Sequence, residues 1–317
     1  MAYICRVNFG FPQNKLSLNH YERKIMNEGS PVLERVPAVF GHEPPLIFGP
    51  TPAFAQVGST TLHTCFTAPE SWSRLGNILH GGFQGLLLDD IITRVVRDLL
   101  KVESPVPKEL ILRYHRPVYA TKPVCIFGHL VEEREQEIIT CGEIKDPEGN
   151  LLTEVEGILA RTRLGGPQPQ ISESSWESEI AALPHWPAWS ACCKGPLEIL
   201  CDLHADWHLA PDQSALGGFL CLPDTLRQMP SAGVLAALFD QTLGLLGSRQ
   251  GHGAMLTVRL QVTMYSSLPI GDELSLLSRG SRSPNGSFKA QAWLFHKHSL
   301  VAEANGHFSV FNRRQSG

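Results

Sequence analysis

Two stretches of the chain place apolar residues three and four positions apart, directly after a glycine-containing turn. This spacing gathers apolar side chains on one face of a helix. In the first stretch, 79–96, the apolar face consists of Phe83, Leu86, Leu87 and Ile91. In the second stretch, 230–247, it consists of Val234, Leu238 and Leu245. We therefore predict one long helix in each half of the chain.

The stretches that follow each predicted helix are rich in β-branched and aromatic residues, with partial alternation of apolar and polar positions. This pattern favours strands. The predicted strands cover 109–119, 125–133, 137–145 and 151–160 in the first half, and 255–265, 273–281, 287–297 and 300–311 in the second. Asp, Asn, Pro and Gly at 146–149 and 283–286 predict hairpin turns. Each half is expected to be a strand, a long helix and an antiparallel meander of about four strands, with the helix packed on the sheet.

An internal repeat relates the two halves. An aspartate follows the first turn residue by nine positions in both copies, from His80 to Asp89 and from Ser231 to Asp240. The stretch 63–72 matches 217–226 upstream, and 149–161 matches 298–310 downstream. Repeated spacing of this kind is typical of a duplicated structural unit.

The repeat divides the 317 residues into parts. The two repeated units are expected at 51–163 and 191–317, a number of residues that suits two domains. Residues 164–190 are rich in Pro, Gly, Ser and Glu and are interpreted as a linker. Residues 1–50 form an extension without a counterpart in the repeat.

The predicted elements and the turn motif resemble the hot-dog fold. The residues that carry this resemblance are Gly76, His80, Gly81, Gly82 and Asp89 in the first copy, Gly233 and Asp240 in the second, and the stretch 257–274. The chain is similar to the hydroxybenzoyl-CoA/phenylacetyl-CoA thioesterase superfamily. The resemblance implies an α+β double hot-dog fold, in which two antiparallel sheets each wrap one long helix and the two halves form a pseudo-dimer. It also implies hydrolysis of an acyl thioester carried by coenzyme A or by acyl-carrier protein.

Thioester hydrolysis needs donors for a developing oxyanion and a carboxylate that attacks or activates water. The amides of Gly81 and Gly82 at a helix N-terminus suit the first role. Nine helical residues span roughly 13 Å, so one helix cannot bring its own turn and its own aspartate to the same carbonyl. In the family, one site joins the turn of one copy to the carboxylate of the other. The resemblance therefore predicts that His80, Gly81 and Gly82 meet Asp240 at site one, and that Ser231, Ala232 and Gly233 meet Asp89 at site two.

Family members often carry a serine shortly before a proline at a strand end, on the copy that supplies the carboxylate. Ser266 and Ser267 precede Pro269 in the second copy, whereas His115 and Arg116 precede Pro117 in the first. Site one is therefore expected to be active and site two degenerate or repurposed. Asp240 is expected to act as nucleophile or base and Gly81 with Gly82 as oxyanion donors, while Ser266 positions water or the carboxylate and His80 fixes the turn. The expected substrate contacts are Arg74, Asn77, Arg116, Ser231 and Gly233.

Each site residue also has a purely structural interpretation. His80 could simply begin a helix, Asp89 or its neighbour Asp90 could be solvated, and Ser266 could be an ordinary strand end. Asp240 lies within the apolar run ALFDQTLG, where an isolated carboxylate is costly, and this favours a functional role. Arg74 stands where many relatives have Asn or Gln.

Two alternatives to hydrolysis stay open. One is another reaction on the same scaffold, such as dehydration, cyclisation or product release in polyketide-type secondary metabolism. Hydratases of this fold usually have Asp and His five residues apart, whereas Arg94 and Leu245 stand at those positions here. The other is an acyl-CoA-binding protein with a decayed site.

Composition and charge narrow the classes of partner. The net charge of −4 is spread without basic blocks, so neither nucleic acid nor a membrane surface is expected as a partner. No stretch reaches the length of a membrane span, and the N-terminus lacks a signal-peptide core, which favours the cytoplasm. No cofactor is expected beyond the coenzyme A or phosphopantetheine of the substrate, and the tandem unit is a candidate homodimer.

The cysteine and histidine pattern gives only a weak metal signal. The eight cysteines form no CxxC pair and are expected to be reduced. Cys201, His204 and His208 have helical spacing, but no fourth ligand accompanies them and the zinc-protease glutamate is absent. No metal site is predicted.

Overall fold

The computed structural model describes residues 54–75, 77–162, 176–186, 205–229, 231–251, 253–284 and 286–311. Residues 1–50, predicted to be an extension, lie outside these ranges. No helix among the described residues is long and apolar enough to cross a membrane.

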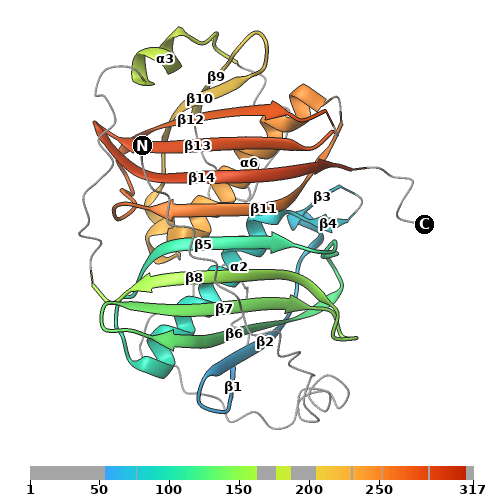
Figure 1. Cartoon of the computed structure of the whole chain (residues 1–317), viewed down its shortest axis with the longest axis vertical. Helices are drawn as coiled ribbons and strands as arrows, with labels where there is room; N and C mark the ends of the chain where they lie inside the picture. The colour runs from blue at the N-terminus through green and yellow to red at the C-terminus, as the bar shows by residue number, and fades with distance from the viewer. Residues whose placement is uncertain are drawn as a thin grey trace. The chain divides into compact units, whose positions relative to one another are not determined.

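The first half contains one long helix and eight strands in the order β1–β4, α2, β5–β8 (Figure 1). The helix α2 covers Gly81–Arg94 and continues as a π-helical turn over Val95–Leu99. The strands are β1 (Ala55–Val57), β2 (Thr61–Thr67), β3 (Ser73–Leu75), β4 (Ile78–Leu79), β5 (Val106–Tyr114), β6 (Pro123–Glu133), β7 (Glu137–Lys145) and β8 (Leu151–Ala160).

The second half repeats this arrangement with one long helix, α6, which covers Ser231–Gly251. Its strands are β9 (Ala205–Leu209), β10 (Ala215–Cys221), β11 (Met255–Met264), β12 (Glu273–Arg282), β13 (Phe288–His296) and β14 (Ser299–Val310). The predicted helices and strands are confirmed, with boundaries that shift by a few residues.

A single antiparallel sheet joins the two halves. Its strand order is β1-β2-β6-β7-β8-β5-β11-β14-β13-β12-β10-β9, and the halves meet where β5 pairs with β11, with Leu112 opposite Leu260. The two long helices lie against one face of this sheet (Figure 1). The predicted α+β double hot-dog fold is therefore confirmed.

The expectation of a simple four-strand meander is wrong in one respect. β6, β7 and β8 follow one another, but β5 pairs with β8 and not with β6. After α2 the chain first forms the strand at the junction with the other half and then crosses to β6 beside β2. This crossing is required because β5 must remain free on one edge to pair with β11.

The two predicted hairpin turns are present. The Gly149 amide donates to the Asp146 carbonyl at 2.9 Å, and the Gly286 amide donates to the Ser283 carbonyl at the same distance. Both glycines have positive φ, 85° and 84°, a conformation that glycine adopts without a Cβ clash. These turns fix the register of β7 with β8 and of β12 with β13.

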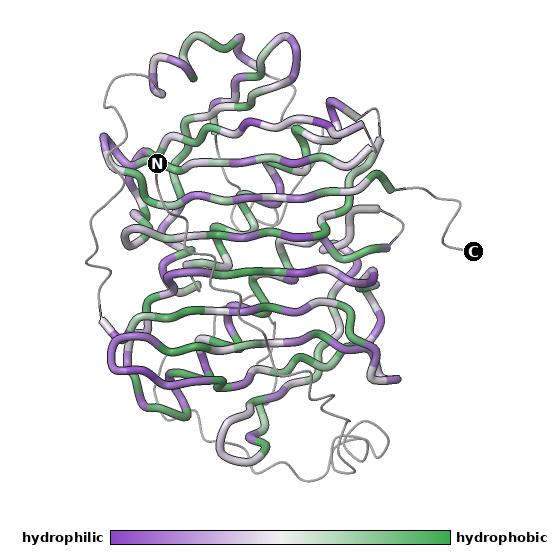
Figure 2. Tube along the Cα trace, in the orientation of Figure 1, coloured by the Kyte–Doolittle hydropathy of each residue, from purple (hydrophilic) through white to green (hydrophobic). Residues whose placement is uncertain are grey.

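The core lies between the helices and the sheet. Phe83, Leu86 and Leu87 of α2 are fully buried, as predicted from their spacing. Figure 2 shows hydrophobic and hydrophilic positions changing repeatedly along the strands, as expected for a sheet with one covered face. The helices also touch each other, because a Cβ added to Gly85 would lie 3.1 Å from the Ala236 methyl group.

The helix α3 (Trp176–Ala182) lies within the stretch predicted to be a linker. Trp176 stacks on Phe295 at 4.3 Å between ring centroids, and Ile180 is fully buried. This part of the chain therefore covers apolar side chains of the second half. The predicted domain boundaries at 51–163, 164–190 and 191–317 stay predictions.

Candidate active site between the two halves

Each long helix begins at a carboxylate that the other half supplies. The Gly82 amide at the start of α2 donates to Asp240 Oδ2 of α6 at 2.9 Å. The Gly233 amide at the start of α6 donates to Asp89 Oδ2 of α2 at 2.6 Å. An unpaired amide at a helix N-terminus, reinforced by the helix dipole, stabilises such a carboxylate. The structure thus brings together the residues assigned to site one and those assigned to site two; their chemical roles stay predictions.

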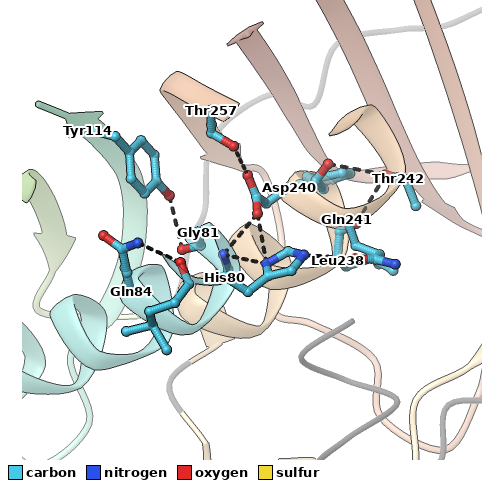
Figure 3. A network of polar contacts seen from close by, with 12 residues as sticks. His80, Gly81, Gln84, Tyr114, Leu238, Asp240, Gln241, Thr242 and Thr257 are labelled. Atoms are coloured by element: carbon cyan, nitrogen blue, oxygen red, sulfur yellow. Dashed lines mark hydrogen bonds and ion pairs between the residues drawn. The ribbon is translucent and has the colours of Figure 1, made fainter. Parts of the chain in front are cut away.

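His80 is the N-cap of α2 and is tied to the second half through both ring nitrogens (Figure 3). Its Nδ1 lies 3.0 Å from Asp240 Oδ2, and its Nε2 lies 2.9 Å from Gln241 Oε1. Nδ1 also lies 3.1 Å from the Gly82 nitrogen, but it cannot both accept that proton and donate to the carboxylate. The Gly82 amide lies closer to Asp240 Oδ2, at 2.9 Å, so we assign its proton to the carboxylate.

Asp240 receives a third donor from β11. The Thr257 hydroxyl donates to Asp240 Oδ1 at 2.5 Å, so the carboxylate lies between Thr257 and His80 (Figure 3). Its side chain is 3% exposed. A Cβ at Gly81 would lie 2.9 Å from Asp240 Oδ2, so the close approach of the turn to the carboxylate requires glycine.

Two further side chains brace the turn. The Tyr114 hydroxyl donates to the Gly81 carbonyl at 3.1 Å, and the Gln84 amide donates to the Leu79 carbonyl at 3.0 Å. Burial raises the pKa of Tyr114 well above its ordinary value, and the negative charge of Asp240 raises it further. Tyr114 therefore stays a neutral donor throughout the physiological range.

The Gly81 amide donates no hydrogen bond to any group in the described parts of the chain. It is the first amide of α2, at the electropositive end of the helix. An amide in this position can donate to an oxygen atom of a bound molecule.

A pocket of about 360 Å³ opens beside Asp240 and the start of α2. We call it the interface pocket, because both halves line it. The first half contributes Ile78, Leu79, His80, Gly81, Gln84, Tyr114, His115, Arg116 and Pro117, and the second contributes Asp240, Gly244, Met255, Leu256, Thr257, Val258 and Ser309. Arg116, predicted to contact substrate, is among them.

Asp89 lies in a different environment. It is 0% exposed, and burial raises its pKa to about 7 against the opposing effect of its hydrogen bond from Gly233. Its neighbour Asp90 accepts a hydrogen bond from Arg94 Nε at 2.9 Å. Neither aspartate is solvated, so that interpretation is wrong. Gly233, predicted to contact substrate, gives its amide to Asp89 and does not line the interface pocket.

Ser266 does not lie where it was expected. It follows the end of β11 beyond Met264, whereas the partner of Asp240, Thr257, lies near the beginning of that strand. The seven residue steps from Thr257 to Met264 alone span roughly 23 Å of strand. Ser266 lies at the end of β11 near Ser231, whose hydroxyl is 4.0 Å from the Met264 sulfur.

Asn77 has a structural role and does not line the interface pocket. It has a positive φ of 66°, and its side-chain amide donates to the Ala120 carbonyl at 2.9 Å. This contact fixes the loop that follows Pro117. The Arg74 side chain and Gly76 lie outside what the structure describes.

The weak metal pattern receives no support. His208 Nδ1 lies 2.9 Å from the Leu183 carbonyl oxygen, and Cys201 and His204 lie outside the described residues. Within the described ranges, no group of three or more His, Cys, Asp or Glu side chains could hold a metal ion.

The fold is shared with solved structures at low sequence identity. The tesB protein of Mycobacterium avium subspecies paratuberculosis matches 82% of this chain and 96% of its own with a TM-score of 0.60 and 14% identity. A hot-dog-fold protein of Alicyclobacillus acidocaldarius matches 82% and 96% with a TM-score of 0.56 and 13% identity. Acyl-CoA thioesterase II TesB2 of Mycobacterium marinum matches 83% and 97% with a TM-score of 0.57 and 13% identity.

No family model matches the sequence, and no curated protein matches it. The likeness to these three structures extends over both halves and includes one protein described as having a hot-dog fold. The chain therefore has the double hot-dog fold that its repeat and its turn motif predict.

Proposed function

We propose that this protein hydrolyses an acyl thioester in the interface pocket. One observation carries the proposal: Asp240 of the second half is held at the glycine turn of the first half, next to the unused Gly81 amide. A carboxylate and an oxyanion donor thus meet at one wall of a pocket. The names of two structural neighbours, a tesB protein and an acyl-CoA thioesterase, agree with this chemistry.

In the proposed reaction, the thioester carbonyl oxygen accepts a hydrogen bond from the Gly81 amide. This contact stabilises the negative charge that develops on the oxygen when the carbonyl carbon is attacked. The helix dipole of α2 adds to the stabilisation. Tyr114 holds the Gly81 carbonyl and so fixes the orientation of the turn.

Asp240 acts as a general base on a water molecule. Gly82, His80 and Thr257 all hold its oxygens, which fixes the position of the carboxylate and limits its movement onto the carbonyl carbon as a direct nucleophile. The water oxygen forms the new bond to the carbonyl carbon and its proton moves to Asp240. The carbon–sulfur bond then breaks, and the proton passes to the leaving thiolate, so that a carboxylic acid and a thiol are released.

The test is thiol release from a panel of acyl-CoAs and acyl-carrier proteins by wild type, Asp240→Asn and Asp89→Asn. We expect Asp240→Asn to lower kcat by at least about a hundredfold, because Asn cannot take the proton. Asp89→Asn is the matched control, since Asp89 has the same relation to the other turn but does not line the interface pocket. Activity retained in Asp240→Asn and lost in Asp89→Asn contradicts the assignment.

One observation favours a second candidate, acyl-CoA binding without turnover. Asp240 is 3% exposed and both of its oxygens already accept hydrogen bonds from the protein. A carboxylate that serves only to join the two halves would have these contacts as well. Saturable binding of acyl-CoA with no thiol release from any substrate would support this candidate.

A further inference from the structure

The interface pocket extends along α6 for one helical turn beyond Asp240. Gly244 lines it and lies on the same face of the helix as Asp240, four residues further on. The corresponding position of α2, four residues after Asp89, is Thr93, whose hydroxyl lies 3.5 Å from Asp89 Oδ1. The absence of a side chain at Gly244 therefore leaves space beside one aspartate that a side chain fills beside the other.

The next turn of α6 is closed. Gly247 lies on the same face, and a Cβ there would come within 2.6 Å of the Phe288 ring, which therefore packs directly on the helix. Phe288 is 1% exposed and does not line the interface pocket. We call the face of α6 from Asp240 to Gly244 the open wall; it is roughly 6 Å long, and Phe288 closes the helix face beyond it.

The lining of the interface pocket contains both apolar side chains and a cationic one. Met255, Leu256 and Val258 of β11 contribute apolar side chains to its lining. Arg116 is an exposed residue of the same lining, and no carboxylate in the described parts of the chain forms an ion pair with it. A guanidinium without an ion-pair partner can bind a phosphate group, and apolar side chains can bind a hydrocarbon chain.

We propose that the acyl group lies along α6 over Gly244 and stops at Phe288, while the phosphopantetheine arm passes Arg116. An extended chain advances roughly 1.2 Å per bond, so the open wall holds about five bonds. The preferred substrates are therefore short-chain acyl thioesters such as butyryl and hexanoyl esters, and Gly244 determines how long a chain fits. This inference rests on the proposed function for the identity of the ligand.

Binding of non-hydrolysable acyl-CoA thioethers tests the inference independently of turnover. The series is coenzyme A alone and its acetyl, butyryl, hexanoyl, dodecanoyl and palmitoyl analogues, measured by calorimetry with the full chain. Wild type is expected to bind the hexanoyl analogue at least about tenfold more tightly than coenzyme A alone, with no further gain for the two longest chains.

Gly244→Ala and Gly244→Leu are expected to remove that gain progressively and to leave the affinity for coenzyme A alone unchanged. Both substitutions favour the helix, by up to about 1 kcal/mol, but Gly244 is buried and a larger side chain can crowd the core. An unchanged affinity for coenzyme A alone is therefore the measure that each variant is folded. Arg116→Ala is the matched variant for the phosphopantetheine arm; it should weaken every member of the series by the same factor, and the effect should fall with added salt.

The outcomes separate the two proposals. Affinity that keeps rising to palmitoyl, or a Gly244→Leu effect that is equal for coenzyme A and for all analogues, overturns the inference. Failure of every compound to bind overturns it too. The predicted binding pattern without hydrolysis of the matching thioesters would sustain the inference and overturn the proposed hydrolysis.

Discussion

Thr257 reaches Asp240 because β11 contains a bulge. The inward-facing residues of β11 are Leu260, Val262 and Met264, so strict alternation would turn Thr257 to the opposite face. The pairing of β11 with β14 shifts register between Thr257 and Arg259, which leaves Val258 without a partner on β14. An extra residue in a strand re-aims its neighbours, and here it directs the Thr257 hydroxyl at the carboxylate.

The contact between Thr257 and Asp240 predicts how substitutions at Thr257 affect catalysis. Thr257→Val keeps the shape but removes the donor, so kcat for thioester hydrolysis should fall by about tenfold or more while KM changes little. Loss of the hydrogen bond should lower the free energy of unfolding by about 1 to 2 kcal/mol. Thr257→Ser restores the donor and should recover most of kcat, whereas equal activity in the Val and Ser variants would exclude a positioning role.

A second prediction concerns Gly81. Gly81→Ala places a methyl group 2.9 Å from Asp240 Oδ2, so the carboxylate must move from the turn. We expect a loss of about 1 to 3 kcal/mol in the free energy of unfolding and a large loss of activity.

Chemical denaturation of Gly81→Ala in the wild-type and Asp240→Ala backgrounds isolates the cause. The destabilisation should largely disappear when the carboxylate has been removed. Equal destabilisation in both backgrounds would show that the methyl group clashes elsewhere.

A third prediction follows from the buried carboxyl group of Asp89. Its pKa in the folded protein is about 7, above its ordinary value of 3.8, because burial disfavours the charged form. Between these two values the folded state holds a proton that the unfolded state has released. The stability contributed by this group is therefore present at low pH and lost as the pH rises from about 4 to about 7.

Asp89→Asn removes that titration. Urea denaturation from about pH 5 to about pH 8 should show a decline in the free energy of unfolding of wild type relative to Asp89→Asn, on the order of a few kcal/mol. Parallel pH profiles for the two proteins would show that Asp89 does not titrate in this range.

A fourth prediction concerns a cysteine pair on β2 and β6. Cys65 and Cys125 are directly opposed, and their sulfur atoms lie 3.1 Å apart. The hydrogen bond with the Cys125 thiol lowers the pKa of Cys65 to about 7. Cys65 is also exposed, whereas Cys125 is buried.

Cys65 should consequently react with iodoacetamide faster than Cys125, Cys141 or Cys221, with half of its maximal rate near pH 7. Cys125→Ala removes the donor and should shift this midpoint to higher pH. Peptide mapping by mass spectrometry after brief labelling measures both effects, and an unchanged midpoint in Cys125→Ala would contradict the assigned cause.

Much of the fold could be predicted because the signals are local. The helical spacing of Phe83, Leu86 and Leu87 and the turn residues at 146–149 act within a few positions. The pairing of β5 with β8 could not be predicted in this way, because hydrophobic alternation shows which face of a strand is buried but not which strand lies next to it.

The site was predicted as far as the repeat reaches. The nine-residue spacing excluded a site on a single helix, and the resemblance to the hot-dog family then predicted that Asp240 lies at the turn of the other half, as it does. Thr257 was missed because only the register with β14 shows the bulge. Ser266 was assigned to the wrong place because a serine before a proline marks only the end of a strand. The end of β11 lies near Ser231, at the start of α6, whereas Asp240 lies near the beginning of β11.

The two unlike halves belong to one chain, and the pairing of β5 with β11 joins their strands into one sheet. In an assembly of identical subunits, a glycine at the position of Gly244 would occur twice, and both helices would lose a side chain from the core. Because both copies belong to one chain, α6 can have Gly244 at this position while α2 keeps Thr93. Each chain should then hold one ligand, so a titration to saturation should end at a single equivalent.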